Sequence, residues 1–234
     1  MYAPQIIYED NHIIAVNKQP SELVQGDRTG DTSLNENLKL WLKNKYNKPG
    51  NVFLGVVHRL DRPVSGVVVF AKTSKSLSRM NNLFKEGDVK KTYWAIVGSR
   101  PGKDSDTLIH QLKKNPSRNK SYVYDKPVKG SKEAILSYKT LYIFKSYTLL
   151  EIDLHTGRHH QIRCQLAKIG SPVLGDLKYG FPRSIDNGGI GLHSRELSFI
   201  HPVSRERIVI RADPSGHVLW EEFLKNNKKC TDFI

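Results

Sequence analysis

A polar turn between two apolar segments constrains this chain more than any other feature. The apolar segments are residues 52–57 (VFLGVV) and 67–71 (VVVFA), and their β-branched and aromatic residues are typical of buried strands. The turn holds one carboxylate, Asp61, and three basic residues stand beside it: His58, Arg59 and Arg62. Nearby positive charge favours the ionised form of an acid and lowers its pKa. The pattern predicts a rigid loop that presents an anionic oxygen at the end of a core strand.

The turn alone supports two interpretations. Neighbouring aspartate and arginine residues on loops are common, and most form solvated ion pairs that contribute little. A carboxylate held between cations at the end of a strand is also what catalysis by an acidic group requires. The composition of the turn therefore leaves both a surface ion pair and a catalytic Asp61 open.

Three segments together resemble the RluA family of pseudouridine synthases. Residues 58–72 (HRLDRPVSGVVVFAK) resemble its signature, and residues 91–97 (KTYWAIV) resemble its Lys-x-Tyr-x-Ala-x-Val pattern. Residues 156–167 (TGRHHQIRCQLA) resemble its Thr-Gly-Arg-Thr-His-Gln-Ile-Arg-Val-His-Leu-Ala, departing at His159, Cys164 and Gln165. A weaker match is Gly175-Asp176-Leu177-Lys178-Tyr179-Gly180. The resemblance covers residues 6 to about 213, nearly the whole chain.

The resemblance implies an α+β fold in which a predominantly antiparallel, mixed sheet is flanked by helices. It further implies that residues 1–234 form a single catalytic domain that isomerises specific uridines in rRNA or tRNA to pseudouridine. No cofactor and no metal are expected. Many relatives carry a small RNA-binding S4 domain ahead of the catalytic domain, and this chain starts too late to contain one.

The resemblance also assigns roles to individual residues. Asp61 is the expected catalytic carboxylate, Tyr93 the residue that stacks on uracil and helps to remove the C5 proton, and Arg163 the cation that pairs with Asp61. Four residues are expected to contact substrate or RNA: Arg59, Arg62, Arg158 and Ile162. Whether the carboxylate attacks the ribose, attacks the base or takes a proton stays open. For Tyr93, packing within a sheet is the alternative.

The charge of the chain agrees with a nucleic-acid partner. Lysine and arginine number 37 against 23 acidic residues, a formal net charge of +14, which favours a polyanion such as RNA. An inactive RNA-binding module of the same fold is therefore the rival function. A glycosidase acting on nucleosides is a second rival, but it needs another carboxylate near Asp61, and none stands close in sequence.

Other features limit where the chain acts. No apolar run approaches the ~20 residues of a membrane span, and the N-terminus lacks the basic start and apolar core of a signal peptide. Two cysteines, Cys164 and Cys230, give no disulfide framework. We expect a cytoplasmic protein with no membrane contact and no protein partner. A zinc site at His155 and His159 is not expected, because no third ligand is evident.

Periodicity and turn residues predict the remaining elements. A hairpin is expected over residues 6–17 and another around residues 204–206, and apolar spacing predicts helices near residues 34–42, 74–86 and 218–224. Thr73 and Gly87 are the expected ends of the second helix. Thr156 is expected to cap a further helix that runs to about Gly170.

Two segments are harder to interpret. Residues 17–20 (NKQP) depart from the family's Asn-Lys-Pro-x-Gly turn, so no substrate contact is expected there. Residues 101–135 are basic and contain few apolar positions. They are expected to be an insertion that is either a mobile hairpin touching RNA phosphates or plain solvated chain.

Overall fold

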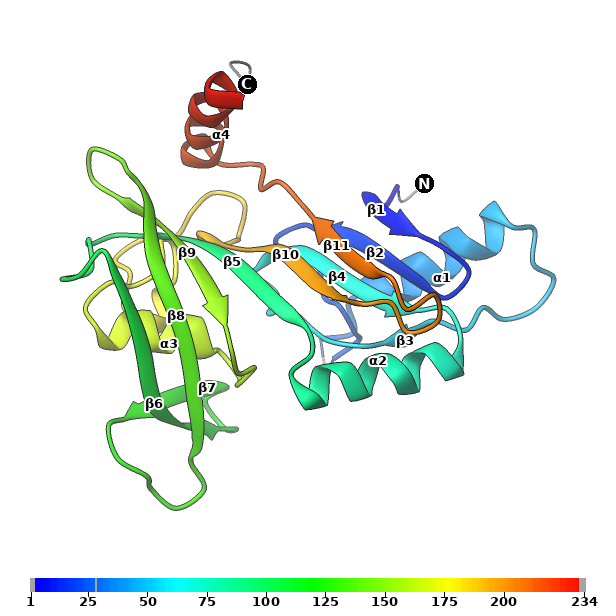
Figure 1. The fold of residues 1–234 in the computed structure, drawn as a ribbon, viewed down its shortest axis with the longest axis horizontal. Helices are drawn as coiled ribbons and strands as arrows, with labels where there is room; N and C mark the ends of the chain where they lie inside the picture. Colours follow the sequence, from blue (N-terminus) through cyan, green and yellow to red (C-terminus); the bar gives the residue numbers. More distant parts are fainter. Residues whose placement is uncertain (1–2, 28, 232–234) are drawn as a thin grey trace.

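The computed structural model describes residues 3–27 and 29–231, with the side chains of residues 227–231 left undescribed (Figure 1). Met1 and Tyr2, which belong to the N-terminal segment assessed above for a signal peptide, lie outside the described residues. The side chain of Cys230 lies outside them as well. Cys164 is a buried free thiol.

One 11-stranded sheet runs through the described residues. Nine strands follow the order β1-β2-β4-β10-β5-β9-β8-β6-β7, while β3 pairs with β4 and β11 with β10. The strands are β1 (Ile6–Glu9), β2 (Ile13–Lys18), β3 (Gly55–Val56), β4 (Ser65–Ala71), β5 (Lys90–Val97), β6 (Ser105–Asn115), β7 (Lys120–Tyr124), β8 (Lys132–Ile143), β9 (Thr148–Leu154), β10 (Leu192–Ile200) and β11 (Arg207–Arg211). Strands β4 and β10 pair in parallel. The expected α+β fold with a predominantly antiparallel, mixed sheet is confirmed.

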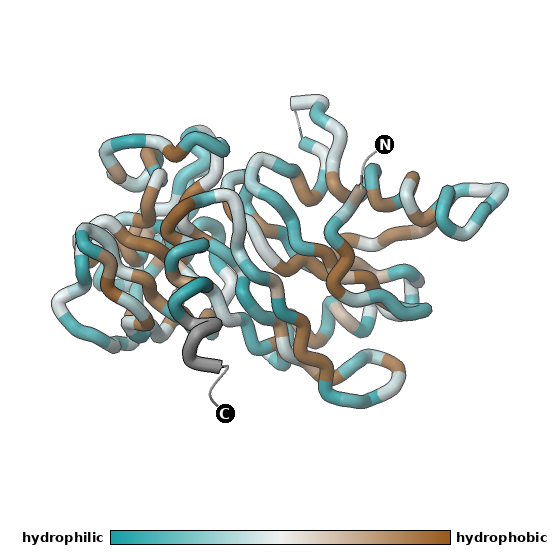
Figure 2. The backbone as a smooth tube through the Cα atoms, turned by 90° about the horizontal axis from the view of Figure 1, so that it is seen from above, coloured by the Kyte–Doolittle hydropathy of each residue, from teal (hydrophilic) through white to brown (hydrophobic). Residues whose placement is uncertain are grey.

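Strand β4 is buried on both faces, between two helices (Figure 1). Helix α1 (Leu34–Lys45) packs its leucines with Val68 and Phe70, whereas Met80 of helix α2 (Ser74–Glu86) packs with Val67 and Val69. Successive residues of a strand point to opposite faces, so an unbroken apolar run is what a strand covered on both sides requires. Figure 2 shows this pattern as hydrophobic colour along the interior strands.

Short-range contacts fix the starts of these two helices, and a glycine ends the second. Ser33 and Thr73 cap α1 and α2, each through a reciprocal pair of hydrogen bonds with the third helical residue, and Gly87 ends α2 in a left-handed conformation (φ 86°). The hairpins β1–β2 and β10–β11 are also confirmed. Helix α4 (Val218–Thr231) follows the second hairpin, as expected.

The expected strand over residues 52–57 is much shorter than predicted. Only Gly55 and Val56 pair with β4. The carbonyl of Leu54 instead accepts a hydrogen bond from the side chain of Asn35 on α1 (3.0 Å), which gives this part of the chain a partner outside the sheet.

Residues 101–135 are not an unstructured insertion. They supply β6, β7 and the start of β8, which form the far edge of the sheet (Figure 1). Leu108, Leu112 and Ala134 are buried there, while the lysines between them point outward. The few apolar positions are spaced for strands with one exposed face, a pattern that the abundance of lysine and asparagine obscures in the sequence.

The expected start of the helix after β9 was wrong. Helix α3 (Gln161–Lys168) begins five residues later than Thr156, and its N-cap residue is His160, which has a left-handed backbone (φ 54°). Thr156 instead lies 2.8 Å from the side-chain oxygen of Gln161 and accepts a hydrogen bond from Ile135 N (2.8 Å). These contacts hold residues 156–160 as a loop against β8, and this loop leads into the site described next. In the described part of the chain, no helix is long and apolar enough to cross a membrane.

Candidate active site

Asp61 lies in the turn between β3 and β4, and a buried lysine holds this turn in place. Lys18, at the end of β2, is fully buried, and its ammonium donates to the carbonyls of Gln19 (2.9 Å), Arg62 (3.0 Å) and Val64 (2.6 Å). Burial lowers the pKa of Lys18 to about 8, which leaves it charged at neutral pH. The ammonium therefore ties the segment that follows Asp61 to the loop that follows β2.

The Ser-Gly pair after the turn is required by close packing against β10. Gly66 has φ 115°, and a Cβ atom there would collide with the backbone of Ser194. Ser65 Oγ lies 2.8 Å from Nδ1 of His193, whose Nε2 lies 2.9 Å from the Ala212 carbonyl. The carbonyl requires a proton on Nε2, so Nδ1 accepts from the serine. These contacts join the start of β4 to β10.

Arg163 of α3 connects Asp61 to a second carboxylate. The arginine side chain is buried, and its Nε and Nη2 donate to the two oxygens of Asp176 at 2.7 and 2.8 Å. Nη1 donates to Oδ2 of Asp61 at 2.9 Å. Burial alone would lower the pKa of Arg163, but the hydrogen bonds and charges of Asp176 and Asp61 raise it above its ordinary value. The expected pairing of Arg163 with Asp61 is present, and Asp176 fixes the arginine in that position.

His160 approaches the same oxygen of Asp61 from the other side. Its Nε2 lies 3.5 Å from Asp61 Oδ2, and its Nδ1 lies 2.9 Å from the hydroxyl of Tyr179. Burial and the nearby Arg163 lower the pKa of His160 to about 2, so the ring is neutral. Tyr179 also accepts from Ser121 N (2.8 Å) on β7. This chain of contacts links the edge hairpin β6–β7 to the Asp61 turn.

Tyr93 and Ile162 form the apolar side of the site. Both are largely buried, and both belong to the apolar cluster that includes Leu60 and Val64 beside Asp61. Burial, together with the charge of Asp61, raises the pKa of Tyr93 to about 12. The phenol is therefore neutral at physiological pH.

The basic residues beside Asp61 in sequence do not surround it in space. His58 accepts from Val69 N (3.1 Å) and stacks on Phe84, and burial followed by the charge of Lys91 lowers its pKa to about 4. Arg62 pairs with Asp31 at 2.9 Å, and Arg59 is exposed. The charged or ionisable groups that reach Asp61 within the described residues come instead from α3 and its N-cap. Because the turn is tight, the side chains of these three sequence neighbours point in three different directions.

Arg158 also points away from Asp61. Its Nε donates to the carbonyl of Glu133 on β8 (2.8 Å), and the residue is exposed. This places a cation at the rim of the site, on the loop that precedes α3.

Sequence reasoning missed Lys18, Asp176, His160 and Tyr179 as parts of this site. Asp176 and Tyr179 stand in the weak match at residues 175–180, and η1 (Leu177–Tyr179) brings them to Arg163 and His160. Lys18 stands in residues 17–20 (NKQP), which match the family's Asn-Lys-Pro-x-Gly turn only in the first two residues, so no role was expected there. Among the residues described, no cluster of three or more His, Cys, Asp or Glu side chains is arranged to hold a metal ion.

Comparison with known proteins identifies the family. The model of a family described as RNA pseudouridylate synthase matches residues 12–168, more than half of the chain. The chain belongs to this family. The resemblance to the RluA group and the expectation of an RNA pseudouridine synthase are thus confirmed at the level of the family.

Individual relatives agree with this family. The chain is 32% identical over 229 residues to ribosomal large subunit pseudouridine synthase C of Buchnera aphidicola (strain Bp), covering 94% of this chain and 70% of the relative. It is 30% identical over 226 residues to tRNA pseudouridine synthase C of Vibrio parahaemolyticus, covering 89% of each protein. Such relatives are longer than the matched region, and the chain spans between 66% and 90% of their lengths.

A solved structure shows the same fold. Human RNA pseudouridylate synthase domain containing 4 superposes with a TM-score of 0.77 at 21% identity, covering 94% of this chain and 92% of that one. At this identity the likeness concerns the fold.

Proposed function

We propose that this protein isomerises specific uridines in rRNA or tRNA to pseudouridine, with Asp61 as the catalytic carboxylate. The observation that carries the proposal is the asymmetric environment of Asp61. Arg163 and His160 both engage Oδ2, whereas Oδ1 has no hydrogen-bond partner among the described residues, and 29% of the side chain is exposed. One oxygen is thus held and the other is free to meet a substrate.

The reaction needs such an oxygen. Isomerisation breaks the N1–C1′ bond, forms a C5–C1′ bond and moves a proton from C5 to N1, so atoms balance without a co-reactant. An ionised carboxylate beside the nucleotide can bond to C1′, bond to C6 of the base or accept a proton from the ribose. Each of these roles uses the same free oxygen, while Arg163 holds the carboxylate through the other one.

Tyr93 and Ile162 fit the roles of residues that hold the base. An aromatic ring beside the carboxylate can stack on uracil, an interaction worth ~1 to 3 kcal/mol. The raised pKa of Tyr93, about 12, makes its anion scarce at neutral pH, which favours stacking over removal of the C5 proton. Ile162 packs in the same apolar cluster and gives the base a second apolar surface.

The arginines at the rim fit RNA binding. A base stacked in RNA hides its reacting atoms, so the target nucleotide must leave the stack, at a cost of a few kcal/mol. Exposed Arg59 and Arg158 and the half-exposed Arg62 would offset this cost by holding phosphates of the distorted strand. These residues would contact RNA while Asp61 and Tyr93 contact the nucleotide and Arg163 holds Asp61 in place.

The substrate class rests on the relatives, whose names state action on large-subunit rRNA and on tRNA. A protein with such substrates would meet them in the cytoplasm. We also propose that residues 1–234 act as one catalytic domain, because a single sheet joins both sides of the site.

The test is to map pseudouridine in total rRNA and tRNA from cells with and without the gene, and then to supply purified protein to the unmodified RNA. We expect one or a few positions to lose pseudouridine in the deletion and to regain it in vitro. Binding of the same RNA with no change at any uridine would favour the inactive RNA-binding module instead.

A further inference from the structure

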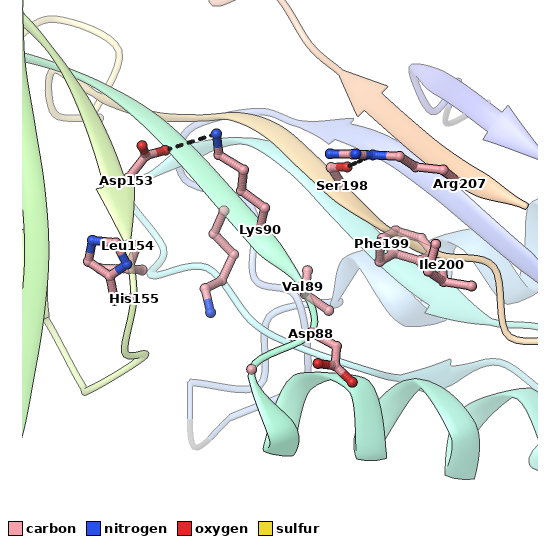
Figure 3. A pocket seen from close by; sticks show the side chains of 12 residues that line it. Asp88, Val89, Lys90, Asp153, Leu154, His155, Ser198, Phe199, Ile200 and Arg207 are labelled. Carbon is pink, nitrogen blue, oxygen red and sulfur yellow. Dashed lines mark hydrogen bonds and ion pairs between the residues drawn. The ribbon is translucent and has the colours of Figure 1, made fainter.

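A hollow of about 580 Å³ lies at the start of β5, the strand that also carries Tyr93 (Figure 3). We call it the β5 hollow. It lies where β5 begins and where β9 and β10 end, and it is lined by residues 87–91, 153–155 and 198–200 together with Arg207. Lys90, Lys91, Arg207 and His155 supply its basic groups, and Asp88 and Asp153 its acidic ones.

Lys91 stands out among these groups. Lys91 is partly buried, yet its side chain forms no hydrogen bond or ion pair within the part of the chain that the structure describes. Burial lowers its pKa. Neighbouring Lys90 differs: its ammonium lies 3.8 Å from Asp153, as Figure 3 shows. A partly desolvated cation with no protein anion beside it is suited to an anion that arrives with a ligand.

The position of Lys91 ties the hollow to the site. Residues two apart on a strand point to the same face, at a spacing of about 7 Å, so Lys91 lies on the same face of β5 as Tyr93. Lys91 is also close enough to influence the pKa of His58, three residues before Asp61. His155 directly precedes the loop that leads to His160 and α3. A strand of RNA with its target base against Tyr93 would therefore pass Lys91.

Neither Asp88 nor Asp153 forms an ion pair with Lys91 in the part of the chain that the structure describes. Asp153 accepts from Thr92 (3.2 Å) and faces Lys90, and it lies on the strand face opposite Lys91. Arg207 uses its Nε on Ser198 (3.3 Å), which leaves its terminal nitrogens without a hydrogen bond among the described residues. Arg207 shares the face of Ser198 and Lys90, so Lys91 is the donor on its own face of β5. The anion that an RNA substrate brings repeatedly is its phosphodiester.

We propose that the β5 hollow binds a backbone phosphate of the substrate RNA next to the target uridine, with Lys91 as its principal contact. This proposal rests on the proposed function and names a subsite for it. Lys91 thereby sets the register of the strand relative to Tyr93 and Asp61, rather than taking part in the chemistry.

The test compares Lys91→Met, which keeps the aliphatic stem, with Lys91→Arg and with the matched control Lys90→Met. RNA affinity is measured against salt concentration, using the RNA that carries the mapped uridine. We expect Lys91→Met to weaken binding roughly tenfold and to reduce the log-log salt slope by about 0.7, the contribution of one phosphate on a single strand. Lys91→Arg should keep the slope, and Lys90→Met should change it less.

Neutral methylphosphonate linkages, placed one at a time around the target uridine, identify the phosphate. One position should weaken binding by the wild type and have no further effect on Lys91→Met. An unchanged slope and affinity in Lys91→Met, or a lower thermal midpoint as its only effect, would overturn the proposal. These readouts measure binding and do not need turnover. A protein that binds RNA in this way but forms no pseudouridine would refute the proposed function and not the phosphate subsite.

Discussion

Two partly or fully buried lysines show how differently the two sides of this site are built. Lys18 beneath the Asp61 turn gives all its donors to three carbonyls, and Arg163 on the same side is shared between two carboxylates. Lys91 in the β5 hollow has no protein partner among the described residues. Burial lowers the pKa of both lysines. We refer to Lys18, Asp61, Arg163, Asp176 and His160 as the closed frame.

The two sides of the site therefore have different roles: the closed frame positions Asp61, and the β5 hollow binds RNA. In the closed frame every buried charge is matched by a nearby opposite charge or dipole, so removing one group leaves another unsatisfied. In the β5 hollow a charge is kept without such a match, so removing it should leave the fold intact and affect what binds there. Substitutions in the frame should therefore cost both stability and activity, and substitutions in the hollow mainly affinity.

The largest effect within the supporting groups is expected at Arg163. Arg163→Lys keeps the charge but cannot form the fork that grips Asp176 and Asp61 together. We expect the single-turnover rate at saturating RNA to fall by about 10²-fold, since small displacements of a reacting group have effects of this size. Arg163→Met should also lower the free energy of unfolding by roughly 3 to 5 kcal/mol, because Asp176 would remain buried without its partner.

The control for Arg163 is Arg211→Lys, which alters an exposed pair with Glu196. It should change rate and stability little. A rate for Arg163→Lys close to that of this control would show that the closed frame does not position Asp61.

The next effect is expected at Lys18. Lys18→Met leaves the carbonyls of Gln19, Arg62 and Val64 without their donor, and we expect the free energy of unfolding to fall by roughly 2 to 5 kcal/mol. Denaturant unfolding measures this, with Lys139→Met as the control because Lys139 forms a surface pair with Glu151. If both variants lose less than about 1 kcal/mol, Lys18 resembles a surface lysine and the contrast with Lys91 fails.

The smallest effect on chemistry is expected at the tip of the β6–β7 hairpin. Changing the exposed Lys113, Lys114 and Arg118 to glutamine should reduce the salt slope of RNA binding by up to about 2, if each cation meets one phosphate. The saturating single-turnover rate should stay near that of the wild type.

A matched variant with Lys48, Lys75 and Lys85 changed to glutamine removes the same net charge from α2 and from the turn that follows α1. An equal loss of slope in both triple variants would mean that the hairpin contributes only general charge. No loss in the hairpin variant would mean that its cations do not contact RNA.

Local signals in the sequence predicted most of the fold, because caps, glycine stops and apolar periodicity act within a few residues. Thr73 and Gly87 bound α2 as expected. The strands of residues 101–135 were hidden because their stability comes from pairing of β6 with β7 and β8, and not from their own composition. Thr156 failed as a cap because its hydroxyl found partners in Gln161 and β8.

The candidate site, like the fold, was predicted only in part from the sequence. Asp61, Tyr93 and Arg163 were indicated by family motifs, and the structure brings Arg163 to Asp61. The environment of Asp61 was not predictable from its neighbours, because the turn directs Arg62 and His58 to other partners. Lys18 and Asp176 stand only in weak or partial family matches, at residues 17–20 and 175–180, from which no role was inferred.

The most direct test of the account is the rate of Asp61→Asn at saturating RNA. The asparagine keeps the shape of the side chain and removes the anion, so we expect pseudouridine formation to fall by at least about 10⁴-fold while RNA affinity and the unfolding midpoint stay near those of the wild type. Turnover within about tenfold of the wild type would contradict the assignment of Asp61 as the catalytic carboxylate.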